Sequence, residues 1–259
     1  MTGSVSFDRA ADYYDRTRAV ADSVMAQLIP LLLAALPVGE PCLEIGIGTG
    51  RIALPLVDEG AHVAGVDISS EMLLKLIAKR RGPWPQVAIA DATRLPFRDA
   101  AFGSAIASHV LHLIPGWKAA VNEVIRVVRP GGVFLVARGG RDRPAWLESI
   151  TRYFFRHAGD PPWPPGAATI DVVDAHMRDL GIDARPLPDL GIETEVTVEE
   201  VIGNLEAGYW AACWGIAPEV RANAAAATRE WARRELGDLG ATRHTVWESS
   251  TWHAYRLPE

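Results

Sequence analysis

The chain has 259 residues, a length that fits one large α/β domain or a domain with an appended subdomain. Hydrophobic residues make up 49% of it and charged residues 22%, an ordinary composition for a globular protein that buries a core. The formal net charge of −6 argues against nonspecific binding to nucleic acids or to anionic membranes, because both favour a basic surface.

The N-terminal residues 1–9 are polar and contain no apolar signal segment. Residues 22–36 are predicted to form an amphipathic helix that ends before Pro37, because the residue before a proline is pushed out of the α region. The longest apolar run lies within that helix and is well short of the ~20 residues of a membrane span. The two cysteines, Cys42 and Cys213, lie far apart and lack metal-ligand spacing. We therefore expect a cytoplasmic protein with free thiols and no contact with membranes.

A glycine-rich turn follows the first predicted strand, 43–45, and leads into a predicted helix over about 51–59. The glycines stand at alternating positions, Gly46, Gly48 and Gly50. They carry no Cβ, so a ligand can lie against bare backbone and against the N–H groups that open the helix. The dinucleotide fingerprint G-x-G-x-x-G would need a glycine where Arg51 stands. Glu44, just before the turn, would repel a pyrophosphate but suits a ligand with an ammonium or sulfonium group.

The second predicted strand, 61–67, ends in Asp67, and Asp91 directly follows the third predicted strand, 86–90. A carboxylate at the position of Asp67 can accept hydrogen bonds from both ribose hydroxyls of a nucleoside. Asp67 could instead cap the helix that follows, although Ser69 could do so in its place. Asp91 alone could equally be a turn residue.

The fourth predicted strand, 104–108, is followed by His109 and, one helical turn later, by His112. A lone histidine is more often a satisfied structural residue than a catalytic one, so both interpretations stay open. A helix over 117–128, a turn over 129–132 and a fifth strand over 133–137 complete this part of the chain.

Several segments resemble, in their order along the chain, the motifs of class I S-adenosylmethionine-dependent methyltransferases. They are Glu44–Gly50, the acidic residues after the second and third strands, and Glu123–Gly132. The likeness is to the methyltransferase type 11-like small-molecule subgroup and covers roughly residues 7–138. It implies an α/β fold, a Rossmann-like seven-stranded mostly parallel sheet with helices on both faces. It also implies S-adenosyl-L-methionine as the cofactor and a small-molecule acceptor, without a metal.

Carried over residue by residue, the likeness implies contacts to each part of the cofactor. The segment 7–18, by pattern alone a solvated helical start, would fold over the cofactor with Tyr14 and Arg18 near the methionine carboxylate. Asp91 would receive the adenine amino group, and the backbone N–H of Ala92 would meet the ring. The implied cofactor-binding residues are Tyr14, Arg18, Glu44, Gly46, Gly48, Gly50, Asp67, Ile68, Met72, Asp91, Ala92, Ser108 and His109. The candidate catalytic residues are His112 and His109.

Beyond Ala137 the chain is rich in aromatic residues at helical spacing. Helices are predicted over 144–158, 170–180, 198–216 and 218–236, with a proline-rich loop over 160–166. A sixth strand is predicted over 182–187, continued by 194–198, and a last strand over 245–256. The candidate substrate residues are Tyr153, Trp163, Trp210 and Trp214, in an apolar helical lid, although each could instead be a core residue.

These elements predict three regions. Residues 1–137 would form the cofactor-binding core with its N-terminal covering segment, and 138–242 mainly helical lid insertions around strand six. Residues 243–259 would form the last, antiparallel strand of the core sheet.

We expect direct in-line methyl transfer to a small, aromatic or apolar metabolite, with O-methylation favoured over N or C. Alignment of the reacting groups supplies much of the rate in such a reaction, on the scale of effective molarities of about 10⁵–10⁸ M. Two alternatives remain open. One is an S-adenosylmethionine-binding enzyme that catalyses a rearrangement or cyclisation without methyl transfer. The other is a dinucleotide-dependent oxidoreductase, which Glu44 and Arg51 disfavour.

Overall fold

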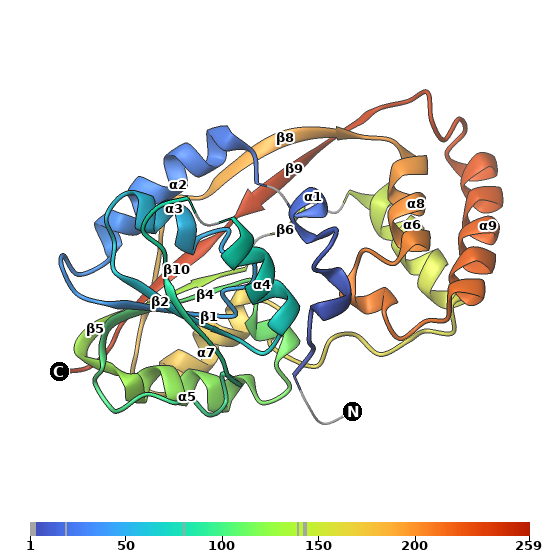
Figure 1. Ribbon diagram of the computed structural model, residues 1–259. Coiled ribbons are helices and arrows are strands. Elements are labelled where there is room, and N and C mark those ends of the chain that lie inside the picture. Colours follow the sequence, from blue (N-terminus) through green and yellow to red (C-terminus); the bar gives the residue numbers. More distant parts are fainter. Residues whose placement is uncertain (1–3, 19, 80, 139, 142–143) are drawn as a thin grey trace. The chain divides into compact units, whose positions relative to one another are not determined.

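The computed structural model describes residues 4–18, 20–79, 81–138, 140–141 and 144–259. Seven of its strands form one sheet in the order β3-β2-β1-β4-β5-β10-β7 (Figure 1). Their bounds are β1 Cys42–Ile45, β2 Val63–Asp67, β3 Gln86–Ile89, β4 Phe102–Ser108, β5 Val128–Ala137, β7 Ala184–Pro186 and β10 Trp252–Arg256. Strands β1 to β5 pair in parallel, whereas β10 runs antiparallel to both β5 and β7. The expected seven-stranded, mostly parallel sheet is confirmed.

Helices cover both faces of this sheet. Their bounds are α1 Tyr14–Thr17, α2 Asp22–Ala35, α3 Ala53–Asp58, α4 Ser70–Ala78, α5 Trp117–Val127 and α7 Ile170–Asp179. On one face, Leu43 and Ile45 of β1 join α5 and α7 in one apolar cluster. On the other face, Cys42 and Leu135 join α2, α3 and α4 in a second cluster. Every residue of β1 and β4 is buried, as expected of central parallel strands covered on both sides.

Residues 140–164 and 191–249 form a second compact unit, whereas 1–139, 165–190 and 250–259 form the first, here called the core unit. The second unit contains α6 Ala145–His157, α8 Val198–Ala207 and α9 Pro218–Glu235. Its strands β6 Gly140–Arg141, β9 His244–Ser250 and β8 Leu190–Val196 form a three-stranded sheet in the order β6-β9-β8. The three helices share an apolar cluster of their own, to which Phe154, Leu205 and Ala225 belong.

Two predicted element boundaries are wrong within otherwise correct elements. The turn expected over 129–132 lies inside β5, because the register of β5 against β4 shifts between Phe102 and Ser104 and the glycines form an irregularity in the strand. The helix expected over 198–216 ends at Ala207, because Gly208 adopts a left-handed φ of +74° that caps it. Trp210 and Trp214 therefore lie beyond α8.

The assignment of the C-terminal strands is also corrected. Residues 194–198 do not continue strand six, since β8 belongs to the three-stranded sheet. The last predicted strand is two strands that separate at Thr251, with β9 paired to β6 and β10 paired to β5 and β7. Both halves alternate apolar and polar residues, so the alternation does not reveal the change of sheet. The expected boundary at 243 therefore lies near 250, and α7 and β7 belong to the core unit.

Both cysteines are buried free thiols, as predicted. None of the helices in the described part of the chain combines the length and the apolar character needed to cross a bilayer.

Candidate functional site

A pocket opens at the edge of the core sheet where β1, β2 and β4 end. Parallel strands place their carboxyl ends at one edge, which is where ligands bind in open α/β sheets. The pocket encloses about 630 Å³ of space, with the open solvent at its mouth included. Ten of the residues predicted to bind the cofactor line it: Tyr14, Gly46, Gly48, Asp67, Ile68, Met72, Asp91, Ala92, Ser108 and His109.

The glycine turn contributes backbone to this pocket. Gly46 and Gly48 have φ angles of +66° and +55°, a region that side-chain-bearing residues rarely adopt. A Cβ on Gly46 would collide with the side chain of Val110, so packing as well as ligand access requires this glycine. At Gly48 the nearest atom to an added Cβ would be the flexible Cε of Met72, at 3.2 Å. A side chain at Gly48 would therefore be strained by its backbone angle but would meet few atoms of the fold, and it would enter the pocket.

The carboxylate of Asp67 is oriented by two backbone N–H groups. Gly48 donates to Oδ2 and Ser69 donates to Oδ1, both at 2.8 Å. Burial raises the pKa of Asp67, and these hydrogen bonds act in the opposite direction. Ser69, and not Asp67, caps the helix that follows, because the Oγ of Ser69 accepts the N–H of Met72 at 3.2 Å. Asp67 thus faces the pocket with its remaining lone pairs open to a ligand's hydroxyls.

Asp91 makes the turn that its sequence context predicted. Its Oδ1 accepts both the backbone N–H and the hydroxyl of Thr93, each at 2.9 Å. The same residue lines the pocket, so the turn and the proposed adenine contact are compatible.

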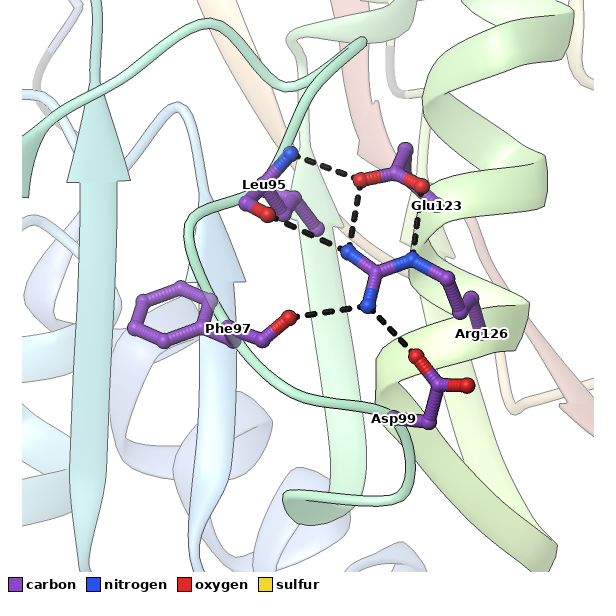
Figure 2. A network of polar contacts seen from close by, with 5 residues as sticks. All are labelled: Leu95, Phe97, Asp99, Glu123 and Arg126. Atoms are coloured by element: carbon purple, nitrogen blue, oxygen red, sulfur yellow. Dashed lines mark hydrogen bonds and ion pairs between the residues drawn. The ribbon is translucent and has the colours of Figure 1, made fainter.

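The loop that follows Asp91 is fastened to α5 by one arginine (Figure 2). Arg126 donates to the carbonyls of Leu95 and Phe97 and to Asp99, at 2.8–3.1 Å. It also forms a bidentate pair with Glu123, whose Oε2 accepts the N–H of Leu95 at 2.7 Å. Two side chains of one helix thereby fix the loop that carries one wall of the pocket.

The N-terminal segment is tied to the glycine turn and to α4 by three carboxylates that the sequence analysis missed. The contacts are Asp8 with Ser69, Asp12 with Lys75, and Asp15 with both Lys79 and Thr49, at 2.6–2.7 Å. The acids are four and three residues apart, a spacing that places side chains on one face of a helix and could have revealed them. The contacts hold Tyr14 at the pocket, where its ring meets Phe7 edge-on.

Glu44 is a fully buried carboxyl group beside the turn. It is 2% exposed, and its Oε2 has no hydrogen-bond partner. Burial raises the pKa of Glu44 to about 8, while the guanidinium of Arg51 acts in the opposite direction. An unpartnered buried polar atom costs about 1–3 kcal/mol. Glu44 is therefore placed to gain stability from a cationic ligand.

His109 follows β4 and holds a left-handed φ of +54°. Its N–H donates to the carbonyl of Ala137 at 3.1 Å, which ties the end of β4 to the end of β5. Burial lowers its pKa well below the ordinary value, followed by the charges of Arg51, His112, Arg138 and Arg18.

His112 does not line the pocket, and its Nδ1 is buried without a partner. Burial, followed by the guanidiniums of Arg138 and Arg18, lowers the pKa of His112 to about 3. The imidazole is neutral at pH 7 and is a weak base there, because general bases are most effective with pKa values near the operating pH.

Three of the predicted cofactor residues lie outside the pocket lining: Arg18, Glu44 and Gly50. Gly50 is needed for packing, since a Cβ there would approach Leu54 Cγ to 2.8 Å. Arg18 accepts a hydrogen bond from Arg51 Nη1 through its carbonyl, at 2.9 Å. Burial and Arg51 lower the pKa of its own guanidinium.

The four aromatic residues predicted to contact the substrate all lie in the second unit. Tyr153 of α6 stacks on Trp231 of α9 with ring centroids 4.9 Å apart. The indole N–H of Trp214 donates to a backbone carbonyl at 3.0 Å, and Trp210 packs against the unit's apolar cluster. Trp163, on the proline-rich loop, is 57% exposed. Their contact with a substrate stays a prediction.

Comparisons with known proteins cover most of the chain that lines this pocket. A family model described as a methyltransferase domain matches residues 43–136. A demethylmenaquinone methyltransferase of Beutenbergia cavernae is 35% identical over 153 residues, which are 58% of this chain and 62% of that protein. The chain therefore spans about three fifths of the length of this curated relative.

Solved structures share the fold at low sequence identity. The YcgJ protein of Bacillus subtilis superposes with a TM-score of 0.63 at 16% identity, over 92% of this chain and 100% of that one. The [4+2]-cyclase SpnF superposes with a TM-score of 0.57 at 17% identity, over 99% and 98% of the two chains. The domain match, the order of the motifs and the fold agree, and residues 43–136 of this chain are similar to the class I S-adenosylmethionine-dependent methyltransferases.

Proposed function

We propose that this protein transfers a methyl group from S-adenosyl-L-methionine to a small, aromatic or apolar metabolite, with oxygen favoured over nitrogen or carbon as the acceptor atom. The proposal is carried by the pocket, where a backbone-oriented carboxylate, Asp67, lies beside glycine backbone. The buried Glu44 next to the turn adds a second carboxylate. The name of the Beutenbergia relative supports a small-molecule acceptor.

The residues present fit the cofactor. Asp67 would hold the ribose hydroxyls, Asp91 and Ala92 the adenine, and Tyr14 with Arg18 the methionine carboxylate. Glu44 would face the ammonium group, which would supply the partner that its Oε2 lacks. An opposite charge also favours the ionised form of a buried carboxyl group, so binding would release the proton of Glu44.

When bound, the cofactor supplies an electrophilic methyl group on a sulfonium. The protein's part is to hold the acceptor atom in line with that methyl group at near-attack distance and to keep water out. Methyl transfer there would join the acceptor's lone pair to the methyl carbon and would leave the electron pair of the C–S bond on sulfur. Because His112 is a weak base, its replacement by Ala would reduce turnover by tenfold or less, without a change in the pH profile.

A second candidate is an enzyme that binds the same cofactor and catalyses a cyclisation. The [4+2]-cyclase SpnF shares the fold of this chain, so the fold is compatible with such a reaction. Its pocket requirements for the cofactor would be the same, and the two candidates differ only in whether methyl leaves sulfur.

Two measurements test the proposal. Calorimetric titration should show binding of S-adenosylmethionine and S-adenosylhomocysteine, and no binding of NAD. A radiolabelled-methyl assay against small hydroxy- and carboxy-aromatic compounds should then show transfer. Cofactor binding without transfer to any acceptor would favour the cyclase, and binding of NAD in place of the sulfonium would refute both.

A further inference from the structure

Two walls of the pocket come from distant parts of the chain, the N-terminal segment 4–18 and the glycine turn. Phe7 and Tyr14 line the pocket from the segment, whereas Gly46 and Gly48 line it from the turn. A ligand that touches both walls requires them to keep one arrangement. The contacts that join the segment to the turn therefore bear on how firmly the pocket holds a ligand.

Asp15 joins these two walls through both of its carboxylate oxygens. Its Oδ1 accepts the hydroxyl of Thr49, and its Oδ2 pairs with Lys79 Nζ, each at 2.6 Å. Lys79 Nζ also donates to the backbone carbonyl of Thr49 at 3.0 Å. Thr49 stands between two glycines of the turn and is 1% exposed. The middle of the turn is therefore held through a hydroxyl and a carbonyl, by a carboxylate that directly follows Tyr14 in the chain.

The composition of the turn explains why such a contact matters. Glycine loses more conformational freedom on folding than any other residue, and Thr49 has a glycine on either side. A contact at Thr49 restricts the peptide groups that it shares with Gly48 and Gly50. A site that is ordered before the ligand arrives loses less of the binding free energy to ordering.

Asp12 offers a comparison within the same segment, because it also pairs with a lysine of α4. It lies 2.7 Å from Lys75 Nζ, and its side chain is 90% exposed. In the described part of the chain, Asp12 is bonded to α4 and not to the turn. Exposed ion pairs of this kind contribute little, since solvent screens them. The two aspartates thus differ in whether they reach the turn.

We propose that Asp15 is a positioning residue for the cofactor, which together with Lys79 holds the turn and the N-terminal segment in one arrangement around the bound molecule. This inference rests on the proposed cofactor site and adds two residues that lie outside the pocket lining. Asp15 acts through Thr49 and through its neighbour Tyr14. Most differences in affinity between variants of one site lie in the dissociation rate, so the loss of Asp15 should speed release of the cofactor.

The test measures binding kinetics of S-adenosylhomocysteine on the full chain by surface plasmon resonance. Asp15→Ala should raise the dissociation rate at least fivefold. Asp15→Asn should raise it at least twofold, because it keeps an oxygen for Thr49 but loses the charge that faces Lys79. The matched control, Asp12→Ala, should stay within twofold of wild type. A thermal melt of each variant shows that it is folded.

Two further measurements separate positioning from a general loss of stability. The effects of Asp15→Ala and Lys79→Gln on the dissociation rate should be less than multiplicative in the double variant, because both side chains act on Thr49. In the ligand-free protein, hydrogen exchange of peptides that cover residues 46–51 should be faster in Asp15→Ala than in wild type. Asp12→Ala should leave this exchange unchanged.

The inference is overturned by any of three outcomes. They are equal dissociation rates for Asp15→Ala and Asp12→Ala, multiplicative effects in the double variant, or unchanged hydrogen exchange at the turn. If Asp15→Ala does not fold, Asp15→Asn decides, and a dissociation rate within twofold of wild type refutes the role of Asp15. Failure of the proposed function is distinct: the wild-type protein would not bind S-adenosylhomocysteine, whereas the hydrogen-exchange comparison would still report on Asp15.

Discussion

The two units of this protein differ in whether their buried polar groups have hydrogen-bond partners. In the described part of the chain, the buried side-chain atoms without a hydrogen-bond partner all lie in the core unit, among them those of Glu44, Arg51 and His112. In the second unit, the buried hydroxyls of Thr151 and Thr228 donate to the carbonyls of Leu147 and Ala224. An unpartnered buried polar atom costs about 1–3 kcal/mol, and a bound ligand can supply the missing partner. The contrast indicates a ligand site in the core unit and internally satisfied packing in the second.

The largest expected effect that tests this contrast is at the glycine turn. Gly48→Val should abolish binding of S-adenosylmethionine, because a branched side chain at a φ of +55° is strained and would enter the pocket. Calorimetry measures the binding, and a cooperative thermal melt shows that the variant is folded. Unchanged binding would place the cofactor elsewhere in the molecule.

The next largest expected effect comes from removing the carboxylate of Asp67. Asp67→Ala should weaken S-adenosylmethionine by about 1.5–3 kcal/mol, the range for hydrogen bonds to a charged acceptor. The melting temperature, recorded on the same sample, separates lost binding from lost structure. Wild-type affinity in this variant would show that the ribose assignment is wrong.

A third effect is a pH dependence of stability in the ligand-free protein. The pKa of Glu44 is raised from 4.5 to about 8 in the folded state, so the folded state keeps a proton that the unfolded chain releases. The free energy of unfolding should therefore fall as pH rises through this window, by at most ~1.4 kcal/mol per unit. Glu44→Gln should flatten the slope of melting temperature against pH. Equal slopes for variant and wild type would mean that Glu44 is ionised in both states.

A smaller effect would sharpen the role of the second unit. Trp163 is 57% exposed, so Trp163→Ala should change the melting temperature little. If this tryptophan contacts the acceptor, the variant should raise the acceptor KM or lower turnover. Cofactor affinity should stay within about threefold, ~0.7 kcal/mol. Joint loss of stability and cofactor binding would identify Trp163 as a packing residue.

The smallest expected effect comes from a substitution at Gly203, a glycine of the second unit that is compared with Gly48. Gly203 lies inside α8, and no atom lies within 4 Å of the place where a Cβ would be. Gly203→Ala should raise the free energy of unfolding by ~0.5–1 kcal/mol, because alanine loses less backbone entropy in a helix. Titration should give the wild-type affinity for S-adenosylmethionine. A loss of affinity would mean that the second unit takes part in cofactor binding.

The core sheet and the pocket could be predicted because their signals are local. A strand, its terminal acid and the glycines that follow are adjacent in the chain, so Asp67 and Gly48 were identified without a view of their neighbours. The contacts of the N-terminal segment were not identified, because Asp8, Asp12 and Asp15 are distant in the chain from the α4 residues that they bind. The change of sheet at Thr251 was missed for a related reason, since both strands have the same alternating pattern and differ only in their partners.

The position of β10 between β5 and β7 has a consequence for the order of folding. β7 is joined to the core sheet only through β10, and all of 191–249 lies between these two strands in the chain. A growing chain can complete the parallel strands β1 to β5 early, but β7 stays without a strand partner until residues 252–256 have been made. Strand pairings that close so long a loop are slow, and an open strand edge invites pairing with other chains. The interval before β10 docks is therefore when this protein is most prone to aggregate, and a chain truncated after Ser249 should remain in that state.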